Sequence, residues 1–184
     1  MKLIQKPAGH SLKIKYAVFF WIVFCNLIVQ ALHHQLEGWG IASWNLFLVN
    51  ILFFMMEEEP YKERLIRCTC GVIVGLLSVW FLCVVNGAVT AAGLPHIVAV
   101  MIPLTVVLFL IIIGGAYCPT VFNSVGFAYF MVGLIDPGTT FAHLGTYMVG
   151  GLLGNLLING TAALLIQYMI RHFQKKAAAL QKTE

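Results

Sequence analysis

The sequence has 184 residues, of which 60% are hydrophobic and only 10% are charged, with a formal net charge of +4. Soluble domains carry about 25% charged residues, and a small domain exposes too much of its surface to hide so much apolar area from water. The composition therefore excludes an ordinary soluble domain. Between Arg67 and Arg171 the only charged residue is Asp136, so this stretch is expected to lie in lipid.

Polar and turn-forming residues divide the apolar sequence into six segments. A helix that crosses a bilayer needs about 20 residues, and the second and fifth segments are shorter than this. We predict an all-α, polytopic membrane protein with six transmembrane helices. A short cytoplasmic segment at 1–15 precedes a single transmembrane domain at 16–170, and a cytoplasmic tail follows at 171–184. The expected spans are residues 16–34, 41–56, 66–86, 95–115, 119–135 and 142–170.

Particular residues mark where these spans begin and end. A run of glutamates at 57–59 and Pro60 stop the second span, and the third is expected to end at Asn86-Gly87. Proline is well placed at the start of a helix, as at Pro95 and Pro119. Gly114-Gly115 is expected to close the fourth span, and residues 136–138 form a turn by composition.

The basic residues predict the topology. All eleven Lys and Arg residues fall before the first span, between the second and third, or after the sixth. With six spans these three regions share one side of the membrane, which the positive-inside rule makes the cytoplasm. Both termini are therefore expected there, and the positive net charge does not indicate nucleic-acid binding.

An internal similarity favours an inverted 3+3 repeat, with halves at 16–86 and 95–170. Residues 53–56 (FFMM) resemble residues 129–132 (YFMV), and each is followed by a proline and then by a helix containing G-x-x-x-G. Three spans per half would make the second half enter the membrane from the opposite side, as in many transporters. The alternative is chance similarity between apolar segments.

The two glycine motifs are candidate packing sites, because glycines spaced by four let helix backbones approach closely. They predict close helix packing either within one chain or between subunits of a homo-oligomer. The residues are Gly71 and Gly75 in the third span and Gly150 and Gly154 in the sixth.

The second and fifth spans are short and polar, which points to a solute pathway when it recurs in two halves. Their amide and aromatic side chains are expected to face each other and to bind a small neutral or zwitterionic solute. The alternative is hydrogen bonding between helices, a common role of asparagine in membranes. The pathway candidates are Trp44, Asn45, Asn50, Phe122 and Asn123.

Other polar residues form less definite patterns. Asn26 with Gln30, and Asn155 with Asn159, are each one helical turn apart and form polar stripes that line a cavity or face a neighbouring helix. Asp136 is expected to be a turn residue or helix cap. Histidines 33, 34, 96 and 143 fall on the outward side, where they would sense pH or bind a metal, but their spacing defines no geometry.

No nucleotide loop, metalloprotease motif or nucleophile elbow occurs in the sequence, and Cys68-Thr69-Cys70 lacks metal-site spacing. We therefore expect no catalytic residues, no bound metal and no cofactor. The expected partners are the lipid bilayer, a small polar solute and a second copy of the chain, but no nucleic acid.

The chain also resembles a family of small bacterial inner-membrane proteins catalogued as domain of unknown function 1097. The resemblance rests on residues 40–44 (GIASW), on the glycine-spaced span that follows, and on residues 119–122 (PTVF) and 127–130 (FAYF). It implies a bacterial inner-membrane location and brings no catalytic residues.

Together these features favour a channel or transporter for a small polar solute, acting around the second and fifth spans. A non-transporting accessory or scaffold protein of the membrane is the second hypothesis, and a membrane enzyme is the third.

Overall fold

The computed structural model describes residues 8–56 and 59–180, and every regular element within them is helical, which confirms the all-α prediction. Glu57, Glu58, Lys2, Lys6 and Lys182, on which part of the predicted topology rests, lie outside the described residues. The helices are α1 (Ala8–Ala31), α2 (His33–Gly38), α3 (Ser43–Met55), α4 (Tyr61–Ala91), α5 (His96–Tyr117), α6 (Ser124–Gly133), α7 (Pro137–Ala142), α8 (Leu144–Leu153), the π-helical segment η1 (Gly154–Asn159) and α9 (Gly160–Leu180).

Three helices in the described part of the chain are long and apolar enough to cross a membrane: Tyr61–Ala91, His96–Tyr117 and Leu144–Lys175, the last formed by α8, η1 and α9 without a break. The other predicted spans correspond to shorter apolar helices. With 13 residues in α3 and 10 in α6, these two helices reach about 20 Å and 15 Å, less than the roughly 30 Å hydrocarbon core.

The predicted start of the fifth span is wrong, because Pro119 to Asn123 form a turn and α6 begins only at Ser124. A side chain from another helix holds the backbone of this turn in place. Arg67, near the start of α4, donates from Nε and Nη2 to the Pro119 carbonyl at 3.1 and 2.9 Å and also pairs with Glu59. The Asn123 side chain then caps the new helix.

Two predicted helix ends are also wrong, because the glycines there stay helical. Asn86-Gly87 lies inside α4, which continues to Ala91 and ends before Gly93, whose φ is +78°. Gly114 and Gly115 lie inside α5. A Cβ on Gly114 would lie 2.8 Å from the Phe122 ring, so this glycine makes room for a side chain and does not end the helix.

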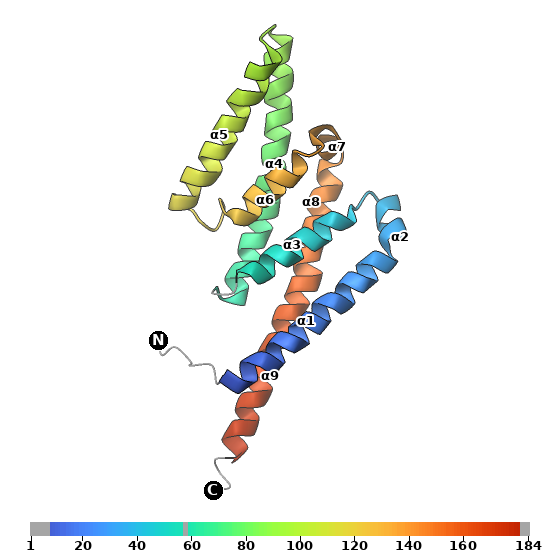
Figure 1. Ribbon diagram of the computed structural model, residues 1–184, viewed down its shortest axis with the longest axis vertical. Helices are drawn as coiled ribbons and strands as arrows, with labels where there is room; N and C mark the ends of the chain where they lie inside the picture. The colour runs from blue at the N-terminus through green and yellow to red at the C-terminus, as the bar shows by residue number, and fades with distance from the viewer. Residues whose placement is uncertain (1–7, 57–58, 181–184) are drawn as a thin grey trace.

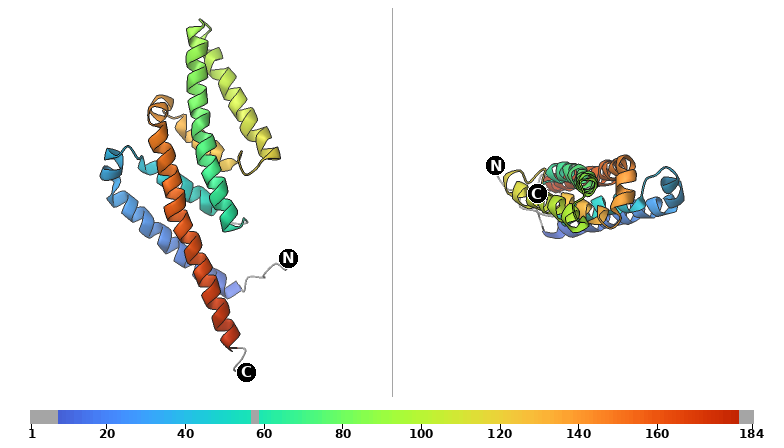
Figure 2. Two further views of the ribbon diagram at one scale, coloured as in Figure 1. Left: turned by 180° about the vertical axis from the view of Figure 1, so that it is seen from behind. Right: turned by 90° about the horizontal axis from the view of Figure 1, so that it is seen from above.

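The helices form two layers (Figure 2). Seen from above, α4 and the α8–η1–α9 helix form one layer, and α1, α3, α5 and α6 form the other. Helices α5 and α6 pack on α4, whereas α3 packs on α8 and η1 and α1 packs on α9. Figure 1 shows α3 and α6 crossing the two long helices obliquely. The core between the layers includes Val49, Phe53, Val72, Leu76 and Tyr129.

Glycines on the long helices make both oblique crossings close. A Cβ on Gly75 would lie 2.5 Å from the Tyr129 Cβ and 2.6 Å from the Gly126 carbonyl oxygen of α6, and Gly71 meets Val125 in the same way. A Cβ on Gly154 would lie 2.9 Å from Leu46 of α3. The two glycine motifs thus serve packing within one chain, with Gly150 against Ile41 at 3.0 Å.

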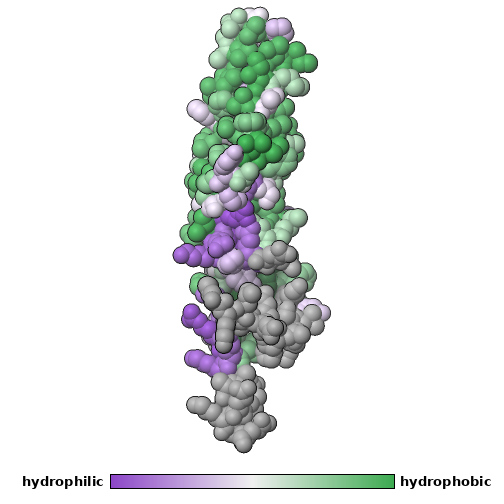
Figure 3. Space-filling view, turned by 90° about the vertical axis from the view of Figure 1, so that its left-hand side faces the viewer, coloured by the Kyte–Doolittle hydropathy of each residue, from purple (hydrophilic) through white to green (hydrophobic). Residues whose placement is uncertain are grey.

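Polar residues gather toward one end of the long axis. The first turns of α1 and α4 and the last turn of α9 all point to the lower end in Figure 1. Figure 3 shows apolar surface over the upper half of the face that it presents and patches of hydrophilic surface below it. These three helix ends therefore face the same way along the long axis of the molecule.

Candidate functional site

Five asparagines lie on α1, α3 and the π-helical segment, which pack on one another, and we call them the asparagine cluster. Four of them are almost fully inaccessible: Asn45 and Asn159 are 0% exposed, Asn50 is 1% and Asn155 is 3%. The fifth, Asn26 of α1, is half-buried. Burying an amide is costly unless it is hydrogen-bonded. The hydrogen-bond partners of each amide in the cluster are therefore important.

Part of the cluster forms a chain of hydrogen bonds that connects three helices. Asn155 Nδ2 donates to the Leu65 carbonyl of α4 at 2.8 Å and to Thr69 Oγ1 at 3.0 Å. Asn159 Nδ2 donates to Asn155 Oδ1 at 3.0 Å and to the Val49 carbonyl of α3 at 3.3 Å. This half of the cluster holds helices together, as asparagine often does in membranes.

Four other amide atoms of the cluster have no hydrogen-bond partner among the described residues. Among the described residues no partner is present for Asn45 Nδ2 and Oδ1, for Asn50 Oδ1 or for Asn159 Oδ1. Each buried unpaired group costs about 1–3 kcal/mol, and native proteins keep few of them. Four such atoms therefore mark a place where hydrogen bonds are offered to something that residues 8–56 and 59–180 do not supply.

The π-helical segment lies at the centre of the cluster and carries Asn155 and Asn159. A π-helical turn adds a residue to the helical repeat and is often found at functional sites. Here the amide groups of the two residues are in contact, and the preceding Gly154 lets α3 approach. Small residues thus bring the α3 and η1 backbones, and with them the asparagines, close together.

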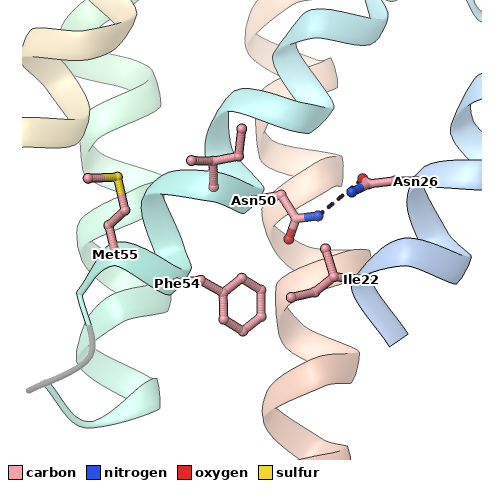
Figure 4. Close-up of a pocket in the computed structure, with 6 residues that line it drawn as sticks. Ile22, Asn26, Asn50, Phe54 and Met55 are labelled. Carbon is pink, nitrogen blue, oxygen red and sulfur yellow. Dashed lines mark hydrogen bonds between the residues drawn. The ribbon is translucent and has the colours of Figure 1, made fainter. Parts of the chain in front are cut away.

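A groove of about 490 Å³ lies beside the cluster and is lined by Ile22, Asn26, Asn50, Ile51, Phe54 and Met55. Figure 4 shows Asn26 of α1 and Asn50 of α3 pointing toward one another across it, joined by a hydrogen bond of 3.3 Å from Asn50 Nδ2 to Asn26 Oδ1. The groove has apolar walls and an amide pair at one place, a lining that suits a small ligand able to form hydrogen bonds.

A second groove, of about 380 Å³, runs along α1 on the side of α8, η1 and α9. Its lining is almost wholly apolar and includes Trp21, Val29, Leu46 and Ile158, with Thr161 as an exception. This second groove therefore offers few hydrogen-bond partners, unlike the groove lined by Asn26 and Asn50.

The predicted pathway residues are separated in the structure. Asn45 lies beside Gly150 and its carbonyl accepts a 2.7 Å hydrogen bond from Tyr129 Oη, whereas Asn123 lies beside Gly71. The Trp44 ring is 6.1 Å from that of Tyr129 and 5.4 Å from that of Tyr147. The expectation that the polar residues of the second and fifth spans face each other is therefore wrong.

Asn123 is a helix cap with no free capacity. Its Oδ1 accepts from the backbone N–H of Val125 and Gly126 at 2.9 and 3.1 Å, and its Nδ2 donates to the carbonyls of Arg67 and Thr120 at 3.1 and 2.9 Å. These bonds use both acceptor positions and both donors of the amide. Asn123 therefore has nothing left to offer a solute.

We expect Asn123→Ala to lower the free energy of unfolding by about 1–2 kcal/mol, the usual cost of losing an N-cap. Asn123→Asp keeps the acceptor and should lose less. Thermal unfolding of the purified protein in detergent measures both. If Asn123→Ala unfolds at the same temperature as the native chain, the Asn123 side chain does not stabilise the start of α6 as described.

Asp136 is a helix cap as well, which is one of the two roles predicted for it from the sequence. Its carboxylate accepts from Thr139 Oγ1 at 2.7 Å and from the Thr139 N–H at 3.1 Å at the start of α7. These two hydrogen bonds hold the pKa of Asp136 below its usual value. The carboxylate thus stays charged at neutral pH, and its exposed position separates it from the buried amides.

Sequence reasoning identified part of this site. Asn26, Asn155 and Asn159 were recognisable as polar stripes by their helical spacing, but their common location was not. The contacts of Tyr129 and Thr69 could not be predicted from the sequence, because their partners Asn45 and Asn155 are 84 and 86 residues away.

Comparison of this chain with protein-family models, with curated proteins and with solved structures finds no match. The resemblance to the small bacterial inner-membrane family stays a prediction.

Proposed function

We propose that this protein is a membrane channel or transporter for a small uncharged polar solute, and that the asparagine cluster is where the solute binds. The observation that carries the proposal is the set of unpartnered amide atoms on Asn45, Asn50 and Asn159. A solute or a file of water that supplies their missing hydrogen bonds would offset the cost of burying them.

The chemistry of the cluster favours an uncharged solute. Amides present donors and acceptors together but carry no net charge, and the side chains of the cluster and of the adjoining groove include no ionisable group. An ion moved into such apolar surroundings would pay a large desolvation cost without a counter-charge. Small amides, polyols and water are the solutes that this site fits.

The inverted repeat predicted from the sequence would place the cluster at the interface of two halves. In support, the short helix of each half packs across the long helix of the other: α6 lies on α4, and α3 lies on α8 and η1. Each crossing uses the G-x-x-x-G motif of the long helix. Transporters built from inverted repeats bind their solutes at this kind of interface.

We further propose that the chain lies in the inner membrane of a bacterium with both termini in the cytoplasm. This rests on the positive-inside rule and on the common direction of the first turns of α1 and α4 and the last turn of α9 (Figure 1). Large apolar side chains exposed on the surface, among them Phe20, Leu27, Phe109 and Ile112, suit contact with lipid or with a second copy of the chain.

A non-transporting accessory protein is the second candidate, and the chain of hydrogen bonds through Asn155 favours it. That residue joins η1 to α4 as structural asparagines do, with contributions of about 1 kcal/mol. The unpartnered atoms distinguish the two functions, because purely structural amides would be expected to pair.

The test is solute flux into proteoliposomes, followed by light scattering after an osmotic step with urea, formamide or glycerol. We expect the native chain to raise the permeability to at least one of them and Asn50→Leu, which removes a polar atom facing the groove, to abolish the increase. Asn86→Leu makes the same change on α4, at a residue whose side chain contacts Thr90, and should leave flux unchanged. Background permeability for every solute would contradict the proposal.

A further inference from the structure

Two histidines and a glutamate converge on the short helix α2. Suitable ligand atoms of His33, His34 and Glu37 all lie within 4.8 Å of one another. The helix brings them together, because residues three and four apart share a face. The His33 Nε2 is 3.3 Å from Glu37 Oε1, and the two imidazole rings are 5.4 Å apart.

The orientation of His33 is set by a residue from another helix. The hydroxyl oxygen of Ser43, the first residue of α3, is 3.1 Å from His33 Nδ1. This contact leaves Nε2 directed to the side where Glu37 lies. Metal-binding histidines almost always have their second ring nitrogen held in this way by an outer partner.

We propose that His33, His34 and Glu37 form a binding site for a divalent transition-metal ion, of which zinc is the best match. Two imidazoles and one carboxylate are a set of ligands that zinc accepts in sites with three protein ligands, with water in the fourth position. The side chains of His33 and Glu37 are 31% and 53% exposed, so an ion can enter from solvent without rearrangement of the core.

The site connects two parts of the molecule. Its ligands lie on α2, which follows α1, and its outer partner begins α3, the helix that carries Asn45 and Asn50. A bound ion would fix the His33 ring and, through Ser43, hold the start of α3 to α2. The metal site itself rests on these contacts alone and stands whether or not the chain conducts a solute.

The test uses cobalt(II) as the probe, with full-length protein that carries no polyhistidine tag. We expect one cobalt ion per chain, seen by its visible absorption and displaced by zinc. His34→Ala and Glu37→Gln should each abolish binding at the same cobalt concentration, and Ser43→Ala should weaken it by about 10-fold, as outer partners do.

His96→Ala is the matched control, because His96 lies at the exposed start of α5 and not on α2, which carries the three proposed ligands. It should bind cobalt like the native chain. The thermal midpoint without metal should be nearly unchanged in all variants, because the ligands are on the surface. The proposal is overturned if no cobalt binds, or if binding survives in both His34→Ala and Glu37→Gln.

Discussion

Gly75→Ala is expected to lower the free energy of unfolding by about 3 kcal/mol or more, at the upper end of the usual cost of overpacking. The added Cβ would lie 2.5 Å from the Tyr129 Cβ and 2.6 Å from the Gly126 carbonyl oxygen. Neither atom is the tip of a flexible side chain, so α6 would have to move away from α4. Thermal unfolding and the yield of monodisperse protein in detergent measure the loss.

Gly87→Ala is the control for this change, since it adds the same methyl group to the same helix. Nothing lies within 4 Å of a Cβ at Gly87, and alanine favours a helix over glycine by up to about 1 kcal/mol. This variant should be as stable as the native chain or more stable. Equal losses at both positions would show that the α4–α6 crossing is not as close as described.

Asn45→Leu is expected to raise stability while abolishing solute flux. Leucine is similar in size, and it removes two buried amide atoms that have no partner among the described residues. The relief should amount to about 1–3 kcal/mol. The hydrogen bond from Tyr129 goes to the backbone carbonyl of residue 45 and would persist. Flux should fall to the background of empty vesicles if the amide binds the solute.

Asn155→Leu makes the same change in the paired half of the cluster and should act in the opposite direction. It would remove one hydrogen-bond donor from the Leu65 carbonyl and from Thr69 Oγ1, and one of the two acceptors of Asn159 Nδ2. The bonds from Thr69 to Leu65 and from Asn159 to Val49 would stay, and we expect a loss of about 1–3 kcal/mol. Thermal unfolding of the two variants compares them directly. If Asn45→Leu destabilises the protein as much as Asn155→Leu, the structural function of the asparagines is the better explanation.

The hydrophobic segments and most of their borders follow from local chemistry, and they were predictable. Pro60 follows the end of α3 and Pro95 precedes α5, both as expected. The basic residues that the structure describes lie in or near the end turns of helices. The failed start of the fifth span depends on distant contacts. Asn123 begins α6 because its side chain caps that helix and is held by the Arg67 carbonyl, and nothing near it in the sequence carries this information.

The same limit applies to the site. Helical spacing identified Asn155 with Asn159 as one stripe, and the short polar segments drew attention to Asn45 and Asn50. Whether an amide is paired or free depends on which backbone carbonyl lies next to it after packing. Asn123 and Asn45 have the same chemistry, yet one makes four hydrogen bonds and the other makes none through its side chain.

By itself, the sequence determined that this chain is helical and has helices suited to a membrane, because the length of apolar runs and the scarcity of charge are local properties. The tertiary structure decided how those helices meet. It placed α3 on η1 and α6 on α4 through glycines that are far away in the chain. The asparagine cluster exists only because of these crossings, since backbone proximity between distant helices creates both its hydrogen bonds and its unpaired atoms.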